Sequence, residues 1–506
     1  MKYINYINMK SWIAALVLSA GLFAACSDDV LVGQLDESKY TTGDGSVMGY
    51  VSDSYGKRMF SNVEFRSSGS VSLHFKTTAK LTMEAAVTVT YDETVLTEYN
   101  NKYGTSYEVF PKNEITFENG GVIKLNAGDV QSSEMKVSYV SDGSLSADKS
   151  YIIPLRIQVT SGNFKLGEED QTRLIFVKDL TGIPDCTKYV DGKPGVKVFS
   201  CMEVNDTNPL NNLSFTLKSN GKPLVDALII FSANINYNAE TGRVYIFNNE
   251  NVQALLDNRE HYLKPLQDRG MKIILGLLGN HDRSGVANMS KETAQAFAQE
   301  VKAMCDAYQL DGIFVDDEYS DYEYSDITPG FVYPGQEAAA RLCYEVKKAQ
   351  PERWVVAYAY STTYGLPAID GMQSGEFVDY ALHDYGGSSD LSSSYPGMPK
   401  SNMGLYSQEF NQGRTASESS LRSMRENGYL SHMIFAMDPN RSNFEWTQMS
   451  AMERMARAFY DDELWEMNRS SVSRYFFNRS TVTLGSERGW NPIIFCFTAG
   501  SLPFVV

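Results

Sequence analysis

The chain has 506 residues, which is enough for more than one domain with a large core. Its formal net charge at pH 7 is −17, from 62 acidic and 45 basic residues. Contacts with nucleic-acid phosphates or with an anionic membrane surface require clustered lysine and arginine, so this charge argues against both partners. We expect a ligand that is neutral or cationic.

The amino-terminal segment has the pattern of a secretion signal. Lys10 is followed by an uncharged stretch, residues 11–25, which is rich in Ala and Leu and ends at Cys26. Small residues directly before a cysteine resemble the bacterial lipoprotein cleavage box, in which the cysteine is lipidated and becomes the first mature residue. The acidic stretch after Cys26 resembles the surface-export signal of Bacteroidetes lipoproteins.

We therefore expect a signal peptide over residues 1–25, lipidation of Cys26 and a polar tether over residues 26–46. This arrangement implies a protein anchored by lipid in the outer membrane at the bacterial cell surface, with a periplasm-facing anchor as the alternative. The other interpretation of the segment is a cleaved signal followed by an ordinary cysteine.

Residues 47–179 alternate between apolar and polar side chains with a period of two, as in residues 70–76 and 152–157. Short strands separated by Asn-Gly-Gly and Ser-Asp-Gly turns predict an all-β antiparallel sandwich domain. One helical pattern, residues 93–103, interrupts them. The region resembles the β-sandwich domains that precede catalytic domains in Bacteroidetes surface glycosidases. A linker over residues 180–195 follows it.

From about residue 196 the pattern changes to apolar strands that alternate with amphipathic helices. We predict eight strands, near residues 196–201, 227–233, 272–278, 312–316, 354–358, 377–382, 404–407 and 432–437. Helices are predicted over residues 251–267, 291–308, 335–349, 418–426 and 447–460. Eight such units predict an α/β fold, a (β/α)8 TIM barrel over residues 196–466. Residues 467–506 form a tail to which we assign no role.

Polar residues follow each apolar strand, which is where a barrel of this kind carries its reactive groups. The richest of these segments follows the fourth strand, at Asp316-Asp317-Glu318-Tyr319. Because side chains alternate along a strand, Asp316 and Glu318 share one face while Asp317 points to the other. An acidic cap for the next helix could explain one carboxylate, but not a pair on the same face.

The sequence Asp311-Gly312-Ile313-Phe314-Val315-Asp316-Asp317-Glu318 resembles the DGxDxDxE signature of family 18 glycoside hydrolases, with Phe314 in place of the middle Asp. Together with residues 277–281, Leu-Leu-Gly-Asn-His, the form DGxxxDDEY is more similar to endo-β-N-acetylglucosaminidases of the Endo H and Endo F type than to chitinases. The resemblance covers residues 196–462.

The resemblance implies retaining, substrate-assisted hydrolysis, in which the acetamido oxygen of the sugar attacks its own anomeric carbon. Glu318 would be the proton donor and later the base, and Asp316 would orient the acetamido N–H. We expect the charge of Asp316 to raise the pKa of Glu318. Tyr385 matches the family tyrosine whose hydroxyl bonds to the acetamido oxygen, although a buried aromatic residue at a strand end is also common.

The candidate substrate-binding residues come from the ends of four strands. Asn280 and His281 match third-strand residues that contact sugars beside the cleaved bond, or else they only form a loop. His383 stands where relatives carry Gln or Asn and could bond the acetamido group or a distal sugar. Tyr319 and Tyr358 could stack on sugar rings or pack in the core.

The function implied is cleavage of the GlcNAc-β1,4-GlcNAc bond in N-linked glycans or glycoproteins, with high-mannose glycans as the leading substrate. The alternatives are a chitinase-type hydrolase and a non-catalytic glycan-binding lipoprotein. No pair of cysteine or histidine ligands completes the carboxylates at residues 316–318, so we predict no metal site, no cofactor and no disulfide framework. We expect a monomer.

Overall fold

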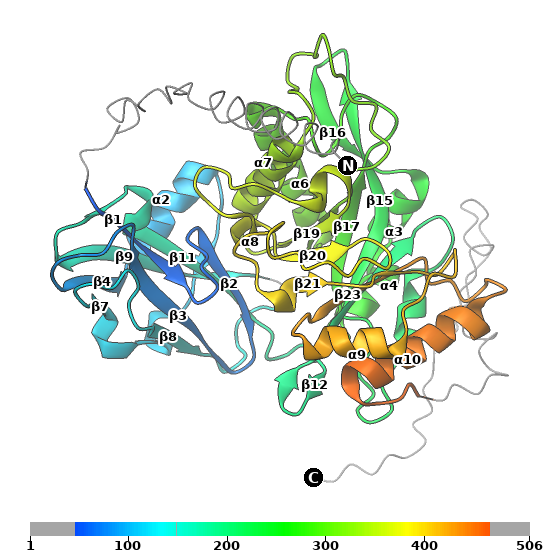
Figure 1. Ribbon diagram of the computed structural model, residues 1–506, viewed down its shortest axis with the longest axis horizontal. Coiled ribbons are helices and arrows are strands. Elements are labelled where there is room, and N and C mark those ends of the chain that lie inside the picture. The colour runs from blue at the N-terminus through cyan, green and yellow to red at the C-terminus, as the bar shows by residue number, and fades with distance from the viewer. Residues whose placement is uncertain (1–45, 148, 466–506) are drawn as a thin grey trace, which may run out of the picture.

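The computed structural model describes residues 46–147 and 149–465, so the expected signal peptide, Cys26, the tether and the carboxyl-terminal tail lie outside the described residues. The described chain forms two bodies, a two-sheet β-sandwich and a closed parallel barrel with helices around it (Figure 1). The predicted fold class, a TIM barrel preceded by an all-β domain, is confirmed.

The sandwich consists of two sheets with one core between them. The first sheet has the order β10 (Lys165–Leu166), β1 (Met48–Asp53), β3 (Ser68–Thr77), β8 (Met135–Val140) and β6 (Ile115–Phe117). The second has the order β2 (Phe60–Phe65), β11 (Thr172–Asp179), β9 (Tyr151–Ser161), β4 (Ala85–Tyr91) and β7 (Val122–Leu125), with β5 (Glu108–Val109) beside β9. The expectation of a fully antiparallel sandwich was wrong, because β10, β11 and β5 each have one parallel neighbour.

The predicted helix in this region is α2 (Glu93–Tyr103), which begins after the Asp92 cap and ends at Gly104 in the left-handed conformation. It packs on the outer face of the second sheet through Val95 and Leu96. That sheet is therefore covered on both faces.

The barrel has eight parallel strand positions. They are β14 (Lys197–Glu203), β15 (Ala227–Asn238), β17 (Lys272–Leu278), β18 (Gly312–Val315), β19 (Trp354–Ala359), β20 (Tyr380–His383), β21 (Met403–Gly404) with β22 (Gln408–Glu409), and β23 (Ser431–Phe435). Pairing of β14 with β23 closes the ring. The arm β16 (Arg243–Phe247) pairs with the end of β15 and projects from the barrel (Figure 1).

Along the described chain, several of the strand-to-strand connections of the barrel contain no full-length helix. The helices around the barrel are α3 (Glu250–Asp257), α4 (Arg259–Tyr262), α5 (Lys264–Gln267), α6 (Lys291–Tyr308), α7 (Gln336–Ala349), α8 (Ser374–Phe377), α9 (Glu418–Glu426) and α10 (Ser450–Tyr460). Among the described residues, β14, β19 and β20 are followed only by 3-10 turns or by the four-residue α8. The predicted helix over residues 251–267 is split in three, and Pro265, which has no N–H to donate, lies at the start of the last piece. The predicted helix over residues 447–460 begins with a π-helical turn, Phe444–Met449.

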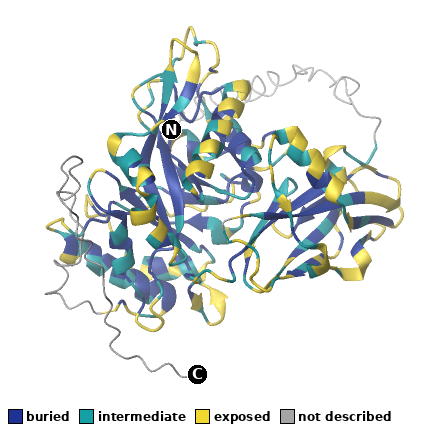
Figure 2. Cartoon of the chain, turned by 180° about the vertical axis from the view of Figure 1, so that it is seen from behind, coloured by how far each residue is buried: buried dark blue, intermediate teal, exposed yellow. Residues whose placement is uncertain are grey.

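Two layers of apolar side chains hold the barrel together. Inside the ring, Phe199, Ile229, Ile274, Phe314 and Met433 fill the interior. A larger layer lies between the strands and the helices, and Figure 2 shows the buried residues concentrated along the strands. The packed interior leaves the strand ends as the places where polar groups can gather.

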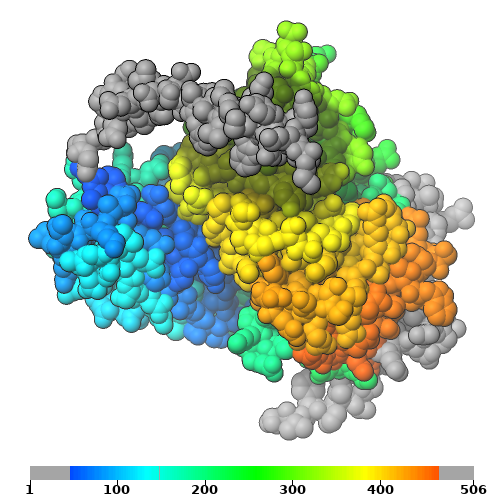
Figure 3. Space-filling model, viewed as in Figure 1, coloured from blue at the N-terminus to red at the C-terminus, as the bar shows by residue number. Residues whose placement is uncertain are grey.

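The sandwich docks on the amino-terminal ends of the barrel strands. Lys57 Nζ lies 3.2 Å from Asp379 Oδ1, directly before β20. The Tyr107 hydroxyl donates to Glu352 Oε2 at 2.8 Å, just before β19, and Glu64 pairs with Lys272 at the start of β17. Figure 3 shows the two bodies in continuous contact. The sandwich therefore lies at the end of the barrel opposite the carboxyl-terminal rim.

Within the described ranges, no helix is both long and apolar enough to cross a bilayer. Cys186, Cys201, Cys305 and Cys343 are buried free thiols. In the same part of the chain, no group of three or more His, Cys, Asp and Glu side chains is arranged to hold a metal ion.

Candidate active site

The carboxylates lie where the short strand β18 leaves the barrel. Phe314, in place of the family Asp, is 1% exposed inside the ring, with its ring centroid 6.2 Å from that of Phe231 and 6.1 Å from that of Tyr358. The backbone N–H of Asp316 donates to the Leu277 carbonyl at 3.1 Å, which extends the ladder by one residue. Strand alternation then places Asp316 above Phe314, at the mouth of the barrel.

Asp316 is a buried carboxyl with an unused acceptor. It is 4% exposed, and its Oδ1 atom has no hydrogen-bond partner among the described residues. Burial and the charges of Glu318, Asp317 and Asp384 raise the pKa of Asp316 well above its ordinary value. An unsatisfied buried acceptor is costly, so this atom is suited to receive a donor from a ligand.

Glu318 is half-buried, and burial followed by the charges of Asp384 and Asp317 raises the pKa of Glu318. The charges of Asp316 and Glu318 act on each other, because the repulsion between two carboxylates is mutual, and this repulsion raises the pKa of the pair. Asp316 is the more deeply buried of the two, so burial disfavours its charged form more strongly. The two groups together hold a proton to a higher pH than isolated carboxyls would.

Asp317 is held on the opposite side of the segment, as predicted. It accepts hydrogen bonds from the hydroxyls of Tyr322, Thr362 and Ser361, the last at 3.3 Å. These three hydroxyl donors hold the Asp317 carboxylate in one position. It therefore acts on the pair as a fixed negative charge.

Strand β20 ends beside the pair and contributes Asp384 and Tyr385. Asp384 Oδ1 accepts from the Tyr358 hydroxyl and from the Tyr385 backbone N–H, both at 2.6 Å. Burial, followed by the neighbouring acidic groups of Cys201 and Asp316, raises the pKa of Tyr385 far above its usual range. The Tyr385 hydroxyl is therefore a neutral donor within the field of Asp316.

Asp384 is a functional residue to which the sequence assigned no role. It raises the pKa of both Asp316 and Glu318 and orients Tyr358. The available signal was its position next to Tyr385 in a polar strand end. That signal alone does not show that its charge reaches β18.

Asn280, His281 and Tyr319 form one corner of the rim. Asn280 Nδ2 donates to Asn236 Oδ1 at 3.0 Å. His281 donates its backbone N–H to the Tyr319 carbonyl at 2.6 Å, and the two rings lie 5.6 Å apart. Tyr319 is 57% exposed, so its ring face is open to a ligand.

The other two candidates are buried. Tyr358 is part of the barrel interior, so its ring is core and only its hydroxyl reaches Asp384. His383 is 5% exposed on the face of β20 opposite Leu382, with its ring 5.6 Å from that of Tyr364. Its ring nitrogens have no partner among the described residues, and burial lowers the pKa of His383. The structure thus brings Asp316, Glu318 and Tyr385 together at the rim. His383 is buried on the other face of β20 and does not join them.

Known proteins match both bodies of the chain. A family model for an N-terminal domain matches residues 43–163. Endo-beta-N-acetylglucosaminidase F1 of Elizabethkingia meningoseptica is 59% identical over 273 residues, which are 54% of this chain and 80% of that protein. An endo-beta-N-acetylglucosaminidase of Flavobacterium sp. (strain SK1022) is 34% identical over 224 residues, 44% of this chain and 68% of that protein.

A solved structure matches across the sandwich and the barrel. It is EndoBT-3987 of Bacteroides thetaiotamicron with Man5GlcNAc product, at 34% identity and a TM-score of 0.75, covering 82% of this chain and 95% of that one. The same protein with Man9GlcNAc2Asn substrate matches at 33% identity with a TM-score of 0.69, over the same shares of the two chains. The chain therefore belongs to the endo-β-N-acetylglucosaminidases of glycoside hydrolase family 18.

Proposed function

We propose that this enzyme cleaves the β-1,4 bond between the two core N-acetylglucosamines of high-mannose N-glycans, with Glu318 as acid and base and Asp316 as the group that steers the acetamide. The observation that carries the assignment is the buried, unpartnered Oδ1 of Asp316 beside Glu318 and Tyr385. The choice of glycan is supported by EndoBT-3987, which was solved with Man5GlcNAc and Man9GlcNAc2Asn.

Substrate arrival sets the protonation state of the pair. The acetamido N–H donates to Asp316 Oδ1, which stabilises the carboxylate form and lowers the pKa of Asp316. The proton that the pair retains then lies on Glu318. Binding thus prepares the anion and the acid that the first step requires.

In the first step Glu318 gives its proton to the glycosidic oxygen and the C1–O bond breaks. The acetamido carbonyl oxygen forms a bond to C1 at the same time, so the sugar itself supplies the electron pair. The resulting oxazolinium ion is stabilised by the Asp316 carboxylate. The Tyr385 hydroxyl donates a hydrogen bond to the acetamido oxygen and aligns that oxygen with C1.

In the second step the Glu318 carboxylate removes a proton from a water molecule. The water oxygen bonds to C1, the C1–O bond of the oxazolinium ring breaks, and the acetamide is restored. Two displacements at C1 retain its configuration. No cofactor takes part in either step.

The test is to incubate the purified enzyme with a high-mannose glycoprotein, a complex-type glycoprotein and a linear N-acetylglucosamine oligomer, and to weigh the products by mass spectrometry. We expect the high-mannose protein to keep one N-acetylglucosamine at each released site. Cleavage of the linear oligomer in preference to both glycoproteins would favour the chitinase alternative.

The location of the enzyme is a separate proposal. The segment before Cys26 and the acidic residues after it support a lipid anchor at the cell surface. Fatty-acid labelling of the native protein and of Cys26→Ala in a Bacteroidetes host, followed by surface proteolysis, tests the anchor. Equal labelling of both proteins would rule it out.

A further inference from the structure

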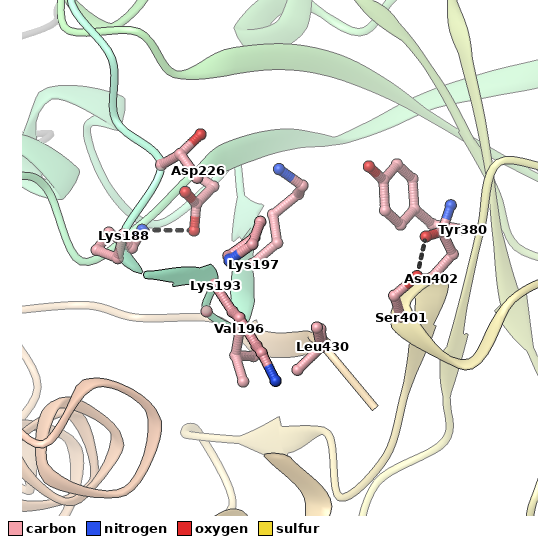
Figure 4. A pocket seen from close by; sticks show the side chains of 12 residues that line it. Lys188, Lys193, Val196, Lys197, Asp226, Tyr380, Ser401, Asn402 and Leu430 are labelled. Carbon is pink, nitrogen blue, oxygen red and sulfur yellow. Dashed lines mark hydrogen bonds and ion pairs between the residues drawn. The ribbon is translucent and has the colours of Figure 1, made fainter. Parts of the chain in front are cut away.

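A hollow of about 430 Å³ lies at the amino-terminal end of the barrel, away from the catalytic rim (Figure 4). It is lined by the first residues of two strands, Lys197 of β14 and Tyr380 of β20, and by Leu430, which precedes β23. The segment containing β12 (Tyr189–Val190) and β13 (Lys193–Pro194) forms another wall. Because a barrel strand of about seven residues rises roughly 3.3 Å per residue, the hollow is roughly 20 Å from the carboxylates.

The charges around the hollow do not cancel. Lys188 Nζ is paired with Asp226 Oδ2 at 2.5 Å, and Asp226 also accepts the backbone N–H of Val198 at 2.8 Å. Among the described residues, the ammonium groups of Lys193 and Lys197 make no hydrogen bond or ion pair. Glu64, which also acts on Lys197, is paired with Lys272. Lys193 is exposed to solvent, whereas Lys197 is half-buried and has no anionic partner among the described residues, in a protein whose net charge is −17.

Lys197 is held in place and stays charged. Its Nζ atom lies 5.5 Å from the centroid of the Trp354 ring, a cation–π contact that orients the side chain. Burial opposes the charge, but Tyr380 and Asp226 raise the pKa of Lys197 above its ordinary value. Figure 4 shows its ammonium and the Tyr380 hydroxyl on facing sides of the hollow, and within the described chain that hydroxyl makes no hydrogen bond.

The size of the hollow narrows the class of ligand. A water molecule occupies about 30 Å³ of liquid, so a bare inorganic anion would leave most of the space unfilled. Ligand sites for small organic molecules begin at about 300 Å³. The lining adds the side chains of Thr187, Ser401 and Asn402 to the apolar side chains of Val196 and Leu430. The Ser401 hydroxyl donates to Asn402 Oδ1 at 2.9 Å and Asn402 Nδ2 donates to the Asp379 carbonyl at 2.8 Å, so these groups offer a ligand only their remaining hydrogen-bonding positions. This combination suits a sugar ring that carries one acidic group.

We propose that this hollow binds an acidic monosaccharide, with its carboxylate or phosphate between Lys197 and the Tyr380 hydroxyl. The site is separate from the catalytic rim and does not depend on the proposed cleavage specificity. The carboxylate of a uronic or sialic acid and the phosphate of a sugar phosphate share the chemistry that the Lys197 ammonium and the Tyr380 hydroxyl recognise.

Isothermal titration of the full enzyme with glucuronate, N-acetylneuraminate, glucose 6-phosphate, inorganic phosphate and glucose tests the proposal. We expect at least one acidic sugar to bind, glucose not to bind, and affinity to fall as salt is raised. Lys197→Met, which keeps the alkyl chain, and Tyr380→Phe should each weaken binding, Lys197→Met by tenfold or more. Lys80→Met is the matched control, because Lys80 is exposed in the sandwich, and it should bind like the native enzyme.

All three variants should release high-mannose glycans at the native rate, because none of the residues lies at the rim. The proposal would be overturned by equal binding of glucose and glucuronate, by binding of inorganic phosphate with no acidic sugar bound, or by native affinity in both Lys197→Met and Tyr380→Phe. Failure of Lys197→Met to fold would leave Tyr380→Phe to decide.

Discussion

Four carboxyl groups meet at the mouth of the barrel, and their environments give each a different task. Asp316 is buried with a free acceptor atom, Glu318 is half-buried, Asp317 is fixed by hydroxyls, and Asp384 accepts from Tyr358 and the Tyr385 backbone. Asp317 and Asp384 serve as fixed negative charges that keep a proton on the other two. In the proposed mechanism, Glu318 needs this shared proton to protonate the leaving group.

Asp384→Asn should move the alkaline limb of kcat/KM to lower pH. Removing this negative charge lowers the pKa of Glu318, and the proton donor is then lost at a lower pH than in the native enzyme. The measurement is a pH profile of kcat/KM on a high-mannose glycopeptide. The Tyr358→Phe variant is the control, because it removes the bond to Asp384 and keeps the charge. An alkaline limb that stayed in place or moved upward in Asp384→Asn would show that Asp384 does not act on Glu318.

Restoring the family aspartate at position 314 should harm this protein. Phe314 lies among Phe231, Tyr358 and other apolar side chains, so Phe314→Asp would bury a carboxyl without partners and leave a cavity. We expect a loss of about 3 to 5 kcal/mol in the free energy of unfolding, measured by urea denaturation. Phe314→Leu, which stays apolar, should cost less. A Phe314→Asp protein as stable as the native one would contradict this packing account.

At the scale of elements, most strands and helices were predicted from the alternation and periodicity of apolar and polar side chains along the chain. The helices at residues 93–103, 291–308 and 418–426 have the predicted bounds because cap residues mark their starts, as Asp92, Ser290 and Ser417 do. The gathering of the polar residues after β18 and β20 at one rim was predictable, because the parallel strands of a barrel end at the same side. The pattern predicted no helix after β14, β19 or β20, and the described part of the chain has only 3-10 turns or the four-residue α8 there.

The contacts that the sequence could not reveal are long-range. The charge of Asp384 on Glu318 acts between two strand ends, and the inward or outward direction of His383 depends on where β20 begins. A shift of one residue in a strand reverses every side chain. The sequence pattern therefore predicts that a strand is present more reliably than it predicts on which face of the strand a terminal side chain lies.

The buried pair between α7 and the start of β20 is an element-scale test. Lys347 Nζ and Asp379 Oδ2 are 2.9 Å apart, with side chains 3% and 9% exposed, and Asp379 also accepts the Val355 N–H at 2.8 Å. Asp379→Asn should cost about 3 to 5 kcal/mol, because it leaves Lys347 buried without a counter-charge. Lys57→Met removes only the bond from the sandwich to Asp379 and should cost less. Equal losses of unfolding free energy would show that Lys347 does not depend on Asp379.

At the scale of the whole molecule, the sandwich and the catalytic rim lie at opposite ends of the barrel. The sandwich touches the segments before β19 and β20 and the start of β17, whereas the carboxylates follow β18. The sandwich therefore packs against the amino-terminal ends of the barrel strands and does not line the site. Its position could not be predicted, because a sandwich sequence specifies its own core and not the surface on which it docks.

Tyr107→Phe combined with Asn62→Ala tests this separation. These residues donate to Glu352 Oε2 at 2.8 Å and to the Glu352 carbonyl at 2.6 Å across the boundary. Asn62 Nδ2 also donates to the Pro351 carbonyl at 3.3 Å. Loss of these three bonds should remove about 1.5 to 4.5 kcal/mol of stability. We expect kcat/KM on a high-mannose glycopeptide to stay within about twofold of the native value, since 1.4 kcal/mol at the transition state would be tenfold. A tenfold fall in kcat/KM in the folded variant would mean that the sandwich acts on the rim.

The central claim is that the acetamide of the substrate is the nucleophile, steered by Asp316, while Glu318 moves the proton in both steps. The most direct measurement supplies the intermediate itself, as a high-mannose glycan oxazoline with an N-acetylglucosaminyl peptide as acceptor. Asp316→Asn should cleave the native glycopeptide at least about 100-fold more slowly than the native enzyme, yet still transfer the oxazoline, because that step no longer needs the anion. Glu318→Gln should fail with both. Native-rate cleavage by Asp316→Asn, or oxazoline transfer by Glu318→Gln equal to that of Asp316→Asn, would contradict the account.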